Sequence, residues 1–224
     1  MRIEEANDLL KPGYLPFEAG WKRYDDGLLV VAARSSLANI TGEMVEWWFT
    51  YVQNTEQYTI WHKDDHVFSD WIGERGTGKY IGGTHIAHER LGGDEIHKLK
   101  INFLDPANIL DVSKFEELGV TAVHARLGID GMPGYAAKMV HFIRDTDYGC
   151  EMRSRFWLGY FEGNDLENNL ETRLTIYPDE LGEGLCKHCH EEMSNFNIFL
   201  PELYEKETGK KAKKNTLNDL LKNV

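Results

Sequence analysis

The amino-acid sequence predicts an α+β fold, in which a curved antiparallel sheet grips a long C-terminal helix. Two observations support this fold class. Short segments rich in apolar and β-branched residues recur between residues 26 and 176, and Gly or Asp occurs in the connections between them. After Pro178 the apolar residues recur instead at steps of three and four, which is typical of one face of a helix. Many strands followed by one amphipathic helix favour the α+β class.

The elements follow in order along the chain. Residues 1–25 are expected to form an N-terminal arm, because Pro12-Gly13 and Pro16 interrupt any helix there. Thr41 is a suitable N-cap for a short helix after the first strand. The predicted strands are Asp26–Ala33, Lys79–Leu91, His97–Leu104, Thr121–Leu127, Ala136–Arg144, Cys150–Tyr160 and Leu170–Ile176.

The long helix carries two ionisable residues on its apolar face. His188 and Glu192 are four residues apart and lie on this face, whereas His190 lies on nearly the opposite side. Burying such groups costs several kcal/mol, roughly, unless they are paired or ligate a metal. They therefore form either a satisfied core pair or part of a functional cavity between helix and sheet. The residues of this face, called the apolar stripe below, are Leu181, Leu185, His188, Glu192, Phe196, Phe199 and Leu203.

Pro201 lies within this apolar stripe and is expected to kink or end the helix there. A short further helix is predicted at residues 215–224. No internal repeat or long linker divides the sequence, so we expect a single domain over residues 1–224.

Two of the predicted strands also place ionisable side chains among apolar ones. Because alternate residues of a strand share a face, His141 points in the same direction as the apolar residues of Ala136–Arg144. By the same rule His85 and Glu89 share one face of Lys79–Leu91, and His88 points the other way. A lone histidine on a strand is more often structural than a ligand.

A further pair of histidines lies between the short helix and the second predicted strand. His62 and His66 are four residues apart, a spacing that would suit two metal ligands on a helical turn. Lys63 stands where the zinc-protease pattern H-E-x-x-H requires Glu, so that pattern is excluded. Asp65 is placed to orient a neighbouring imidazole as a hydrogen-bond acceptor.

Composition limits the class of protein. Hydrophobic residues make up 42% of the chain, enough for a sizeable core, and the net charge of -12 repels phosphate backbones. Three cysteines are too few for a disulfide framework and favour a reducing compartment. No apolar run approaches the ~20 residues of a membrane span, and Met1–Lys11 lacks the apolar core of a signal peptide. We therefore expect a cytoplasmic protein without a nucleic-acid or membrane partner.

Several motifs, in this order and spacing, carry a family resemblance. They are Tyr58–His66, Gly83–Glu89, Met139–His141, Met152–Gly159, His188–Met193 and Phe199–Pro201. Together they resemble the zinc-dependent carbon–carbon hydrolases that include diacetylphloroglucinol hydrolase and phloretin hydrolase. The resemblance extends from about Trp47 to Pro201. It implies a helix-grip fold similar to that of Bet v 1 and START domains, in agreement with the fold class predicted from the pattern.

The resemblance also implies a zinc ion held by three His and one Glu. Carried over to this sequence, these ligands are His66, Glu89, His141 and His188. The choice of His66 over His62 rests on the family motif alone. Nitrogen and oxygen ligands with room for a water molecule suit Lewis-acid chemistry.

The implied reaction is hydrolysis of the bond between an acyl group and a phenolic ring, with a small aromatic ketone as substrate. We assign general acid/base catalysis to Glu192, one helical turn beyond His188, and the orientation of a substrate oxygen to Tyr58. Trp61 would supply an aromatic wall. In longer members the N-terminal region helps to form a dimer, so a homodimer is one state that the resemblance allows.

The sequence departs from the family pattern at two substrate-binding positions. Ser69 stands where the diacetylphloroglucinol enzyme has an Asn that contacts substrate. Phe156 stands near an expected substrate-binding Tyr, for which Tyr160 is a candidate replacement. These changes bear on the identity of the acyl substrate more than on the metal.

Two other functions fit the same predicted cavity. One is a non-catalytic helix-grip protein that binds an apolar or aromatic ligand, with His and Glu serving as hydrogen-bond partners. The other is a metal-dependent hydrolase of esters or β-diketones. Metal content separates the first alternative from the enzyme, and the choice of substrate separates the second.

Overall fold

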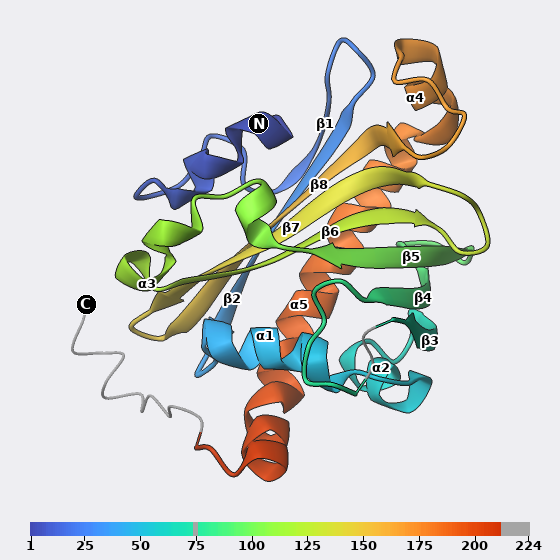
Figure 1. The fold of residues 1–224 in the computed structure, drawn as a ribbon. Helices are drawn as coiled ribbons and strands as arrows, with labels where there is room; N and C mark the ends of the chain where they lie inside the picture. Colours follow the sequence, from blue (N-terminus) through green and yellow to red (C-terminus); the bar gives the residue numbers. More distant parts are fainter. Residues whose placement is uncertain (74–75, 212–224) are drawn as a thin grey trace.

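The computed structural model describes residues 1–73 and 76–211, and the helix predicted at 215–224 lies outside them. In the described part, eight strands form one antiparallel sheet in the order β1-β2-β8-β7-β6-β5-β4-β3. The sheet curves around the long helix α5, Asp179–Thr208, as Figure 1 shows. The predicted fold class, an antiparallel sheet packed on a long C-terminal helix, is confirmed. The strands are β1 (Gly20–Arg23), β2 (Leu29–Ala38), β3 (His66–Ile72), β4 (Thr84–Arg90), β5 (Ile96–Leu104), β6 (Val120–Ile129), β7 (Tyr135–Thr146) and β8 (Gly149–Glu162).

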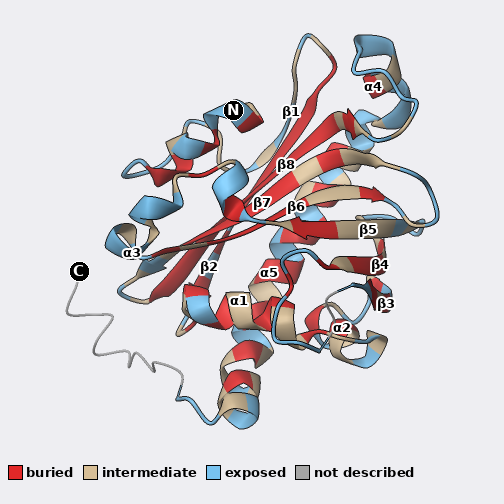
Figure 2. Ribbon diagram, viewed as in Figure 1, coloured by how far each residue is buried: buried red, intermediate tan, exposed pale blue. Residues whose placement is uncertain are grey.

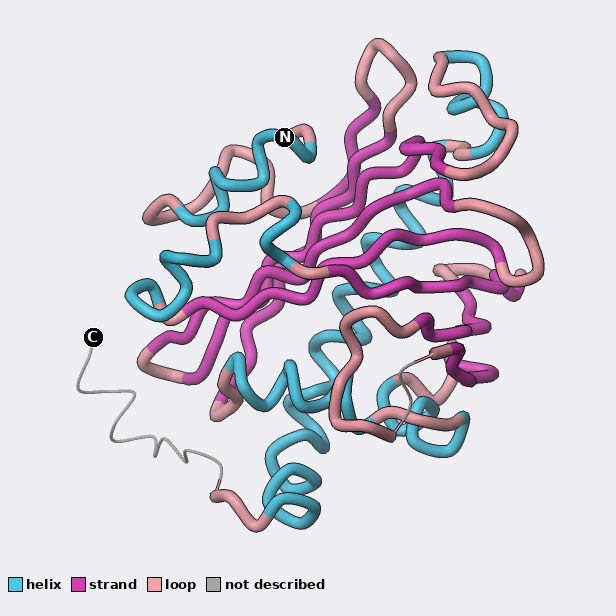
Figure 3. The backbone as a smooth tube through the Cα atoms, in the orientation of Figure 1, coloured by secondary structure: helices cyan, strands magenta, loops and turns pink. Residues whose placement is uncertain are grey.

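Short helices connect and cover the sheet. Thr41 caps α1 as predicted, with its side-chain oxygen accepting a hydrogen bond from the Met44 N–H at 3.4 Å. Figure 3 shows that the N-terminal segment and the helices between β5 and β6 lie together on the other side of the sheet from α5. The short helices are η1 (Ile3–Leu10), α1 (Gly42–Tyr51), α2 (Thr55–Trp61), η2 (Pro106–Asn108), η3 (Val112–Lys114), α3 (Phe115–Leu118) and α4 (Leu170–Ile176).

Two local predictions differ from the structure, and one of the two alternatives given for Pro201 is excluded. Leu170–Ile176 is helical rather than extended, because the side chain of Asn169 accepts the Thr172 N–H and caps a turn of α4. The edge strands β1 and β3 were not predicted. Pro201 does not end α5, which continues to Thr208.

Each face of the sheet has its own apolar core. The core between the sheet and α5 contains most of the aromatic residues of α1 and α2. On the other face, apolar residues of the N-terminal arm pack on β8 and β7. Figure 2 shows the resulting burial along the central strands, and β8 is buried over nearly its whole length.

The N-terminal arm is also bound to β8 through charge. Glu18 accepts hydrogen bonds from Arg153 and from Arg155, two guanidinium groups with side chains that are 1% and 0% exposed. A buried charge is costly unless it is paired, so Glu18 is the counter-charge that makes these two arginines tolerable.

Two glycines let the loop after β4 lie directly against α5. A Cβ on Gly184 would come 2.1 Å from the Leu91 carbonyl oxygen, and one on Gly92 would come 2.5 Å from the Gly184 Cα. Gly92 also has φ +81, a conformation that other residues rarely adopt. This close approach brings the loop against the helix where the cavity described below opens to solvent.

None of the described helices has the length and apolar character that a membrane span requires.

Candidate metal centre

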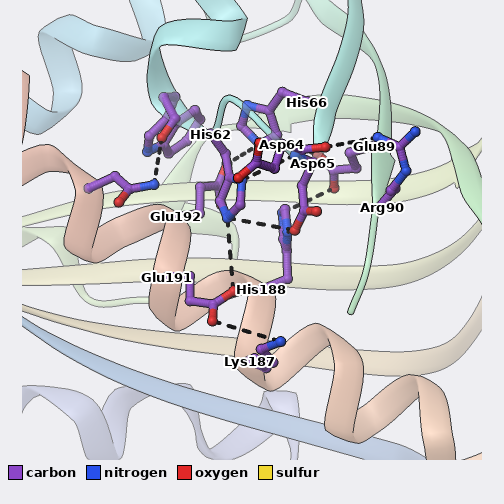
Figure 4. Close-up of polar contacts among 12 residues, drawn as sticks. His62, Asp64, Asp65, His66, Glu89, Arg90, Lys187, His188, Glu191 and Glu192 are labelled. Atoms are coloured by element: carbon purple, nitrogen blue, oxygen red, sulfur yellow. Dashed lines mark hydrogen bonds and ion pairs between the residues drawn. The ribbon is translucent and has the colours of Figure 1, made fainter. Parts of the chain in front are cut away.

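Four buried side chains from three elements converge between the sheet and α5. His66 is the first residue of β3 and is paired in register with Glu89 on β4. His188 and Glu192 project from the buried face of α5, one turn apart. One ligand atom from each of the four lies within 4.8 Å of the others. Figure 4 shows the group and the α5 side chains around it.

The distances within this group fit side chains that share one cation. The His66 Nε2 atom lies 3.2 Å from a Glu192 oxygen and 3.8 Å from a Glu89 oxygen. The His188 Nε2 atom lies 4.0 Å from the other Glu89 oxygen. Two ligands on a tetrahedral zinc ion, with bonds of about 2.0–2.1 Å, are about 3.4 Å apart.

Two ring nitrogens of the group lack a hydrogen-bond partner in the described part of the chain. The Nε2 atoms of His66 and His188 are both buried, and neither is hydrogen-bonded within the described residues. Buried polar atoms are nearly always satisfied, so an exception calls for an explanation. Two unsatisfied imidazole nitrogens that face two carboxylates could together serve as the ligands of a metal ion. The residues present therefore fit a divalent ion.

The other ring nitrogen of each histidine is held by the protein. The His66 Nδ1 atom lies 2.9 Å from the Tyr58 carbonyl oxygen, and the His188 Nδ1 atom lies 2.9 Å from Asp65 Oδ2. Such contacts fix the orientation of a metal-binding imidazole and direct its Nε2 atom to the ion. Asp65 thus occupies the orienting position expected from its place in the motif.

The charges of the group oppose the effect of burial. Burial favours neutral forms, but the carboxylates of Glu89 and Glu192 hold the pKa of His188 above its ordinary value. Burial would likewise raise the pKa of Glu89, but His188 and His66 outweigh it and hold that pKa below the ordinary value. The Glu89 carboxylate is therefore already deprotonated, as a metal ligand must be.

Tyr58 and Trp61, both on α2, form the wall beside His66. The Tyr58 ring is stacked on the His66 ring at 3.7 Å, and its hydroxyl donates a hydrogen bond to Glu89. Burial, together with the charges of Glu89 and Glu192, raises the pKa of Tyr58 well above its ordinary value. Its hydroxyl therefore keeps its proton and acts as a hydrogen-bond donor. The Trp61 ring meets the His66 ring edge-on at 5.6 Å.

The structure separates the two histidines of the motif. Helix α2 ends at Trp61 and β3 begins at His66, so His62 and His66 do not share a helical turn. His66 joins the buried group. His62 is partly exposed, and its Nδ1 atom accepts the Asp65 N–H at 3.2 Å.

His141 lies apart from the four converging residues. It lines the same cavity, with its ring 6.0 Å from that of Phe49, and its Nδ1 atom lies 2.7 Å from Ser154 Oγ. Burial lowers the pKa of His141 to about 4, so the ring is neutral at pH 7. The resemblance implies His141 as the fourth ligand. In the structure the fourth residue of the converging group is Glu192 instead. The four-residue step from His188 to Glu192 was the signal for this in the sequence.

A cavity of about 990 Å³ extends from this group toward solvent. Its buried end includes Glu89, His188 and Glu192, together with His85 and His141. Its middle is apolar, and its outer end lies between the loop after β4 and the first turns of α5. The apolar lining residues include Leu99, Ile101, Phe103, Leu127, Met139, Phe156, Leu158, Leu181 and Leu185.

Comparison with known proteins identifies the family. The family model described as the DAPG hydrolase PhiG domain matches residues 1–205. The chain belongs to this family. The resemblance inferred from the sequence motifs is thereby confirmed.

Two members of the family and one solved structure show how similar this chain is to known proteins. A 2,4-diacetylphloroglucinol hydrolase from Pseudomonas sp is 26% identical over 223 residues, which cover 90% of this chain and 76% of that protein. The phloretin hydrolase of Eubacterium ramulus is 30% identical over 202 residues, which cover 81% of this chain and 69% of that protein. The crystal structure of Ara h 8.0201 aligns with a TM-score of 0.46 at 8% identity, over 77% of this chain and 97% of that one.

The residues predicted to bind substrate in this DAPG hydrolase family member lie in different places. Phe156 and Trp61 line the cavity. Ser69 is buried behind the lining, and its Oγ lies 2.8 Å from the Nε2 atom of His85, which does line it. Burial lowers the pKa of His85 to about 4, so the His85 ring, like the His141 ring, is neutral at pH 7.

Tyr160 lies on the other face of the sheet. The register between β7 and β8 shifts after Leu158, and Gly159 adopts φ +115, so the alternation of inward and outward residues changes there. The Tyr160 ring packs with the N-terminal core, and its hydroxyl lies 3.4 Å from Glu4. It is therefore not a replacement for the substrate-binding Tyr expected near Phe156.

Proposed function

We propose that this protein is a metal-dependent hydrolase that cleaves the carbon–carbon bond between an acyl group and a phenolic ring. One observation carries the proposal: two unsatisfied imidazole nitrogens and two carboxylates meet at a large cavity with an apolar middle, which Glu89, His188 and Glu192 line directly. The names of the relatives, 2,4-diacetylphloroglucinol hydrolase and phloretin hydrolase, supply the substrate class, a phenolic ketone.

His66, Glu89, His188 and Glu192 would hold the ion, and zinc is the metal we propose for this set of nitrogen and oxygen donors. When bound, zinc supplies Lewis-acid polarisation of a carbonyl oxygen and a lowered pKa for a water molecule. This assignment gives Glu192 a ligand role in place of the acid/base role expected from sequence.

The remaining residues of the cavity position the substrate. The apolar middle binds the ring or the acyl chain and excludes water from the buried end. Tyr58 retains its proton and lines the cavity, so on substrate binding its hydroxyl would turn from Glu89 and donate to a phenolic or carbonyl oxygen of the substrate. The Trp61 ring limits the space on the α2 side.

His141 is suited to move the proton that the reaction requires. Hydrolysis breaks the bond between the acyl and ring carbons, adds the hydroxyl of water to the acyl carbon and adds a proton to the ring carbon. Because the Nδ1 atom of His141 is held by Ser154, its Nε2 atom is the nitrogen left for the cavity. A neutral imidazole accepts the proton from water at Nε2 and returns it to the ring carbon.

The His141→Gln variant tests this role. We expect it to keep a full complement of metal and to lose about 10²–10⁴-fold in kcat, the usual contribution of a positioned acid or base. Metal content after dialysis and steady-state kinetics measure the two effects. Loss of the metal would instead make His141 a ligand, as the family resemblance implied.

The proposed function is tested by metal analysis of the purified protein and by assays with three substrate classes: phloretin, acylphloroglucinols and aryl esters. We expect about one metal ion per chain and release of phloroglucinol from phloretin or acylphloroglucinols, followed by ultraviolet absorbance. Turnover of aryl esters alone would replace the carbon–carbon assignment with an ester hydrolase. Protein that binds no metal, binds phenols and turns over none of the three classes would be a ligand-binding member of the fold.

A further inference from the structure

The outer end of the cavity is lined by carboxylates from two elements. Asp94 and Glu95 lie in the loop between β4 and β5, and Glu180 and Glu183 lie in the first turns of α5. All four side chains line the cavity and all four residues are exposed, in contrast to the buried residues at the metal-centre end. We call these four residues the acidic rim.

The charge of the acidic rim is not neutralised locally. Within the described residues, none of its four carboxylates makes an ion pair or a side-chain hydrogen bond with another residue. Lys187 also lines the cavity, and its Nζ lies 3.9 Å from Glu191, outside the rim. Four carboxylates against one ammonium leave an excess of three negative charges at the entrance.

We propose that the acidic rim makes the cavity selective for uncharged aromatic ligands and disfavours aryl carboxylates. The second part of the inference rests on the proposed function, because carbon–carbon hydrolysis converts an uncharged ketone into a carboxylic acid. That acid loses its proton at neutral pH, so the product carries the charge that the rim repels. The rim therefore admits the substrate and opposes rebinding of the acyl product.

The size of the effect follows from the number of charges. A carboxylate at roughly 7 Å from three net charges, in water-like dielectric with a screening length of about 10 Å, binds about fivefold more weakly. The walls of the cavity exclude water and strengthen this repulsion. A positive ion at the buried end would attract the same carboxylate, so without the rim the product would be retained more tightly.

The inference is tested by binding, without any turnover. The probes are 3-phenylpropionamide and 3-phenylpropionate, which have the same shape and differ by one charge, and neither has an acyl–phenol bond to cleave. Their dissociation constants for the metal-loaded protein are measured by calorimetry at low salt. The rim variant is Glu180→Gln/Glu183→Gln, and the control Glu116→Gln/Glu117→Gln removes two exposed charges from α3, on the other side of the sheet.

We expect the rim variant to bind the carboxylate about threefold more tightly at low salt while its affinity for the amide stays unchanged. The gain should disappear at about 1 M salt, where the screening length falls to about 3 Å. The control variant should match the wild type with both probes. An unchanged carboxylate affinity in the rim variant, or an equal gain in the control, would overturn the inference.

The outcome is separable from that of the proposed function. If the charge selectivity is found but no acylphloroglucinol is cleaved, the proposed function is wrong and the selectivity of the cavity stands. If ketones are cleaved but the two probes respond equally to the rim variant, the function stands and the inference about the rim is wrong.

Discussion

The His188→Ala variant is expected to lose both its bound metal and its turnover. Its Nε2 atom is one of two buried nitrogens of the candidate centre that have no hydrogen-bond partner among the described residues, so its removal takes away one of the four converging ligand atoms. Removing an outer partner of a ligand typically costs about 10–100-fold in metal affinity, and removal of the ligand itself should cost more. Metal content after dialysis against a weak chelator, measured beside kcat/KM, checks both effects.

Two other substitutions make this a graded series. Asp65→Asn removes only the carboxylate that holds the His188 Nδ1 atom, so its metal affinity should fall by about 10–100-fold. His190→Ala is the matched control, because His190 lies two residues along α5, is exposed and contacts the Arg34 carbonyl instead of the centre. An His188→Ala protein that retains stoichiometric metal would contradict the assigned centre.

The second large effect concerns stability. Replacing Glu18 by Gln should lower the free energy of unfolding by about 3–5 kcal/mol, because it leaves the buried guanidinium groups of Arg153 and Arg155 without a counter-charge. Urea denaturation of the metal-loaded protein measures the change. Glu116→Gln, an exposed carboxylate on α3, serves as the control and should change stability by less than about 0.5 kcal/mol.

The same interaction has a defined pH dependence. Burial alone would raise the pKa of Glu18, but the hydrogen bonds from Arg153 and Arg155 outweigh it and hold that pKa below the ordinary value. A lowered folded-state pKa means that the stabilisation is complete above the unfolded value of 4.5 and is lost as the pH falls through the folded value. The stability difference between wild type and Glu18→Gln should therefore be constant near neutral pH and shrink in acid. A difference that grows on acidification would contradict this account.

Side-chain periodicity predicted the elements that are buried on a defined face. The helical steps that placed His188 and Glu192 on one face of α5 are observed, because that face of the helix is buried against the sheet and against α1 and α2. Strand alternation likewise placed His141 and Glu89 toward the helix side. Both predictions depend on burial, which determines where apolar residues occur.

The missed elements have weaker periodic signals. β1 and β3 are the two edge strands, and edge strands are partly exposed and carry mixed polar and apolar residues. In Leu170–Ile176 the alternation of apolar and polar residues resembles a strand, but the side-chain cap from Asn169 determines a helix. Tyr160 was placed on the wrong face because a bulge changes the alternation, and the one sign of it in the sequence is Gly159.

The sequence also could not determine which inward-facing residues converge. Glu192 and His141 both face the cavity, and only the three-dimensional packing shows that Glu192 lies 3.2 Å from His66 while His141 lies apart. Periodicity gives the face of an element but not the depth of a side chain within a cavity. The pairing of β3 with β4, which brings His66 opposite Glu89, depends on long-range strand register that no local pattern specifies.

We infer that one divalent ion binds among His66, Glu89, His188 and Glu192. Anomalous diffraction at the zinc absorption edge, from a crystal of the zinc-loaded protein, locates such an ion. We expect one strong anomalous peak within bonding distance, about 2.0–2.2 Å, of atoms from these four side chains. A peak bonded to other residues, or no peak among the four, would contradict it.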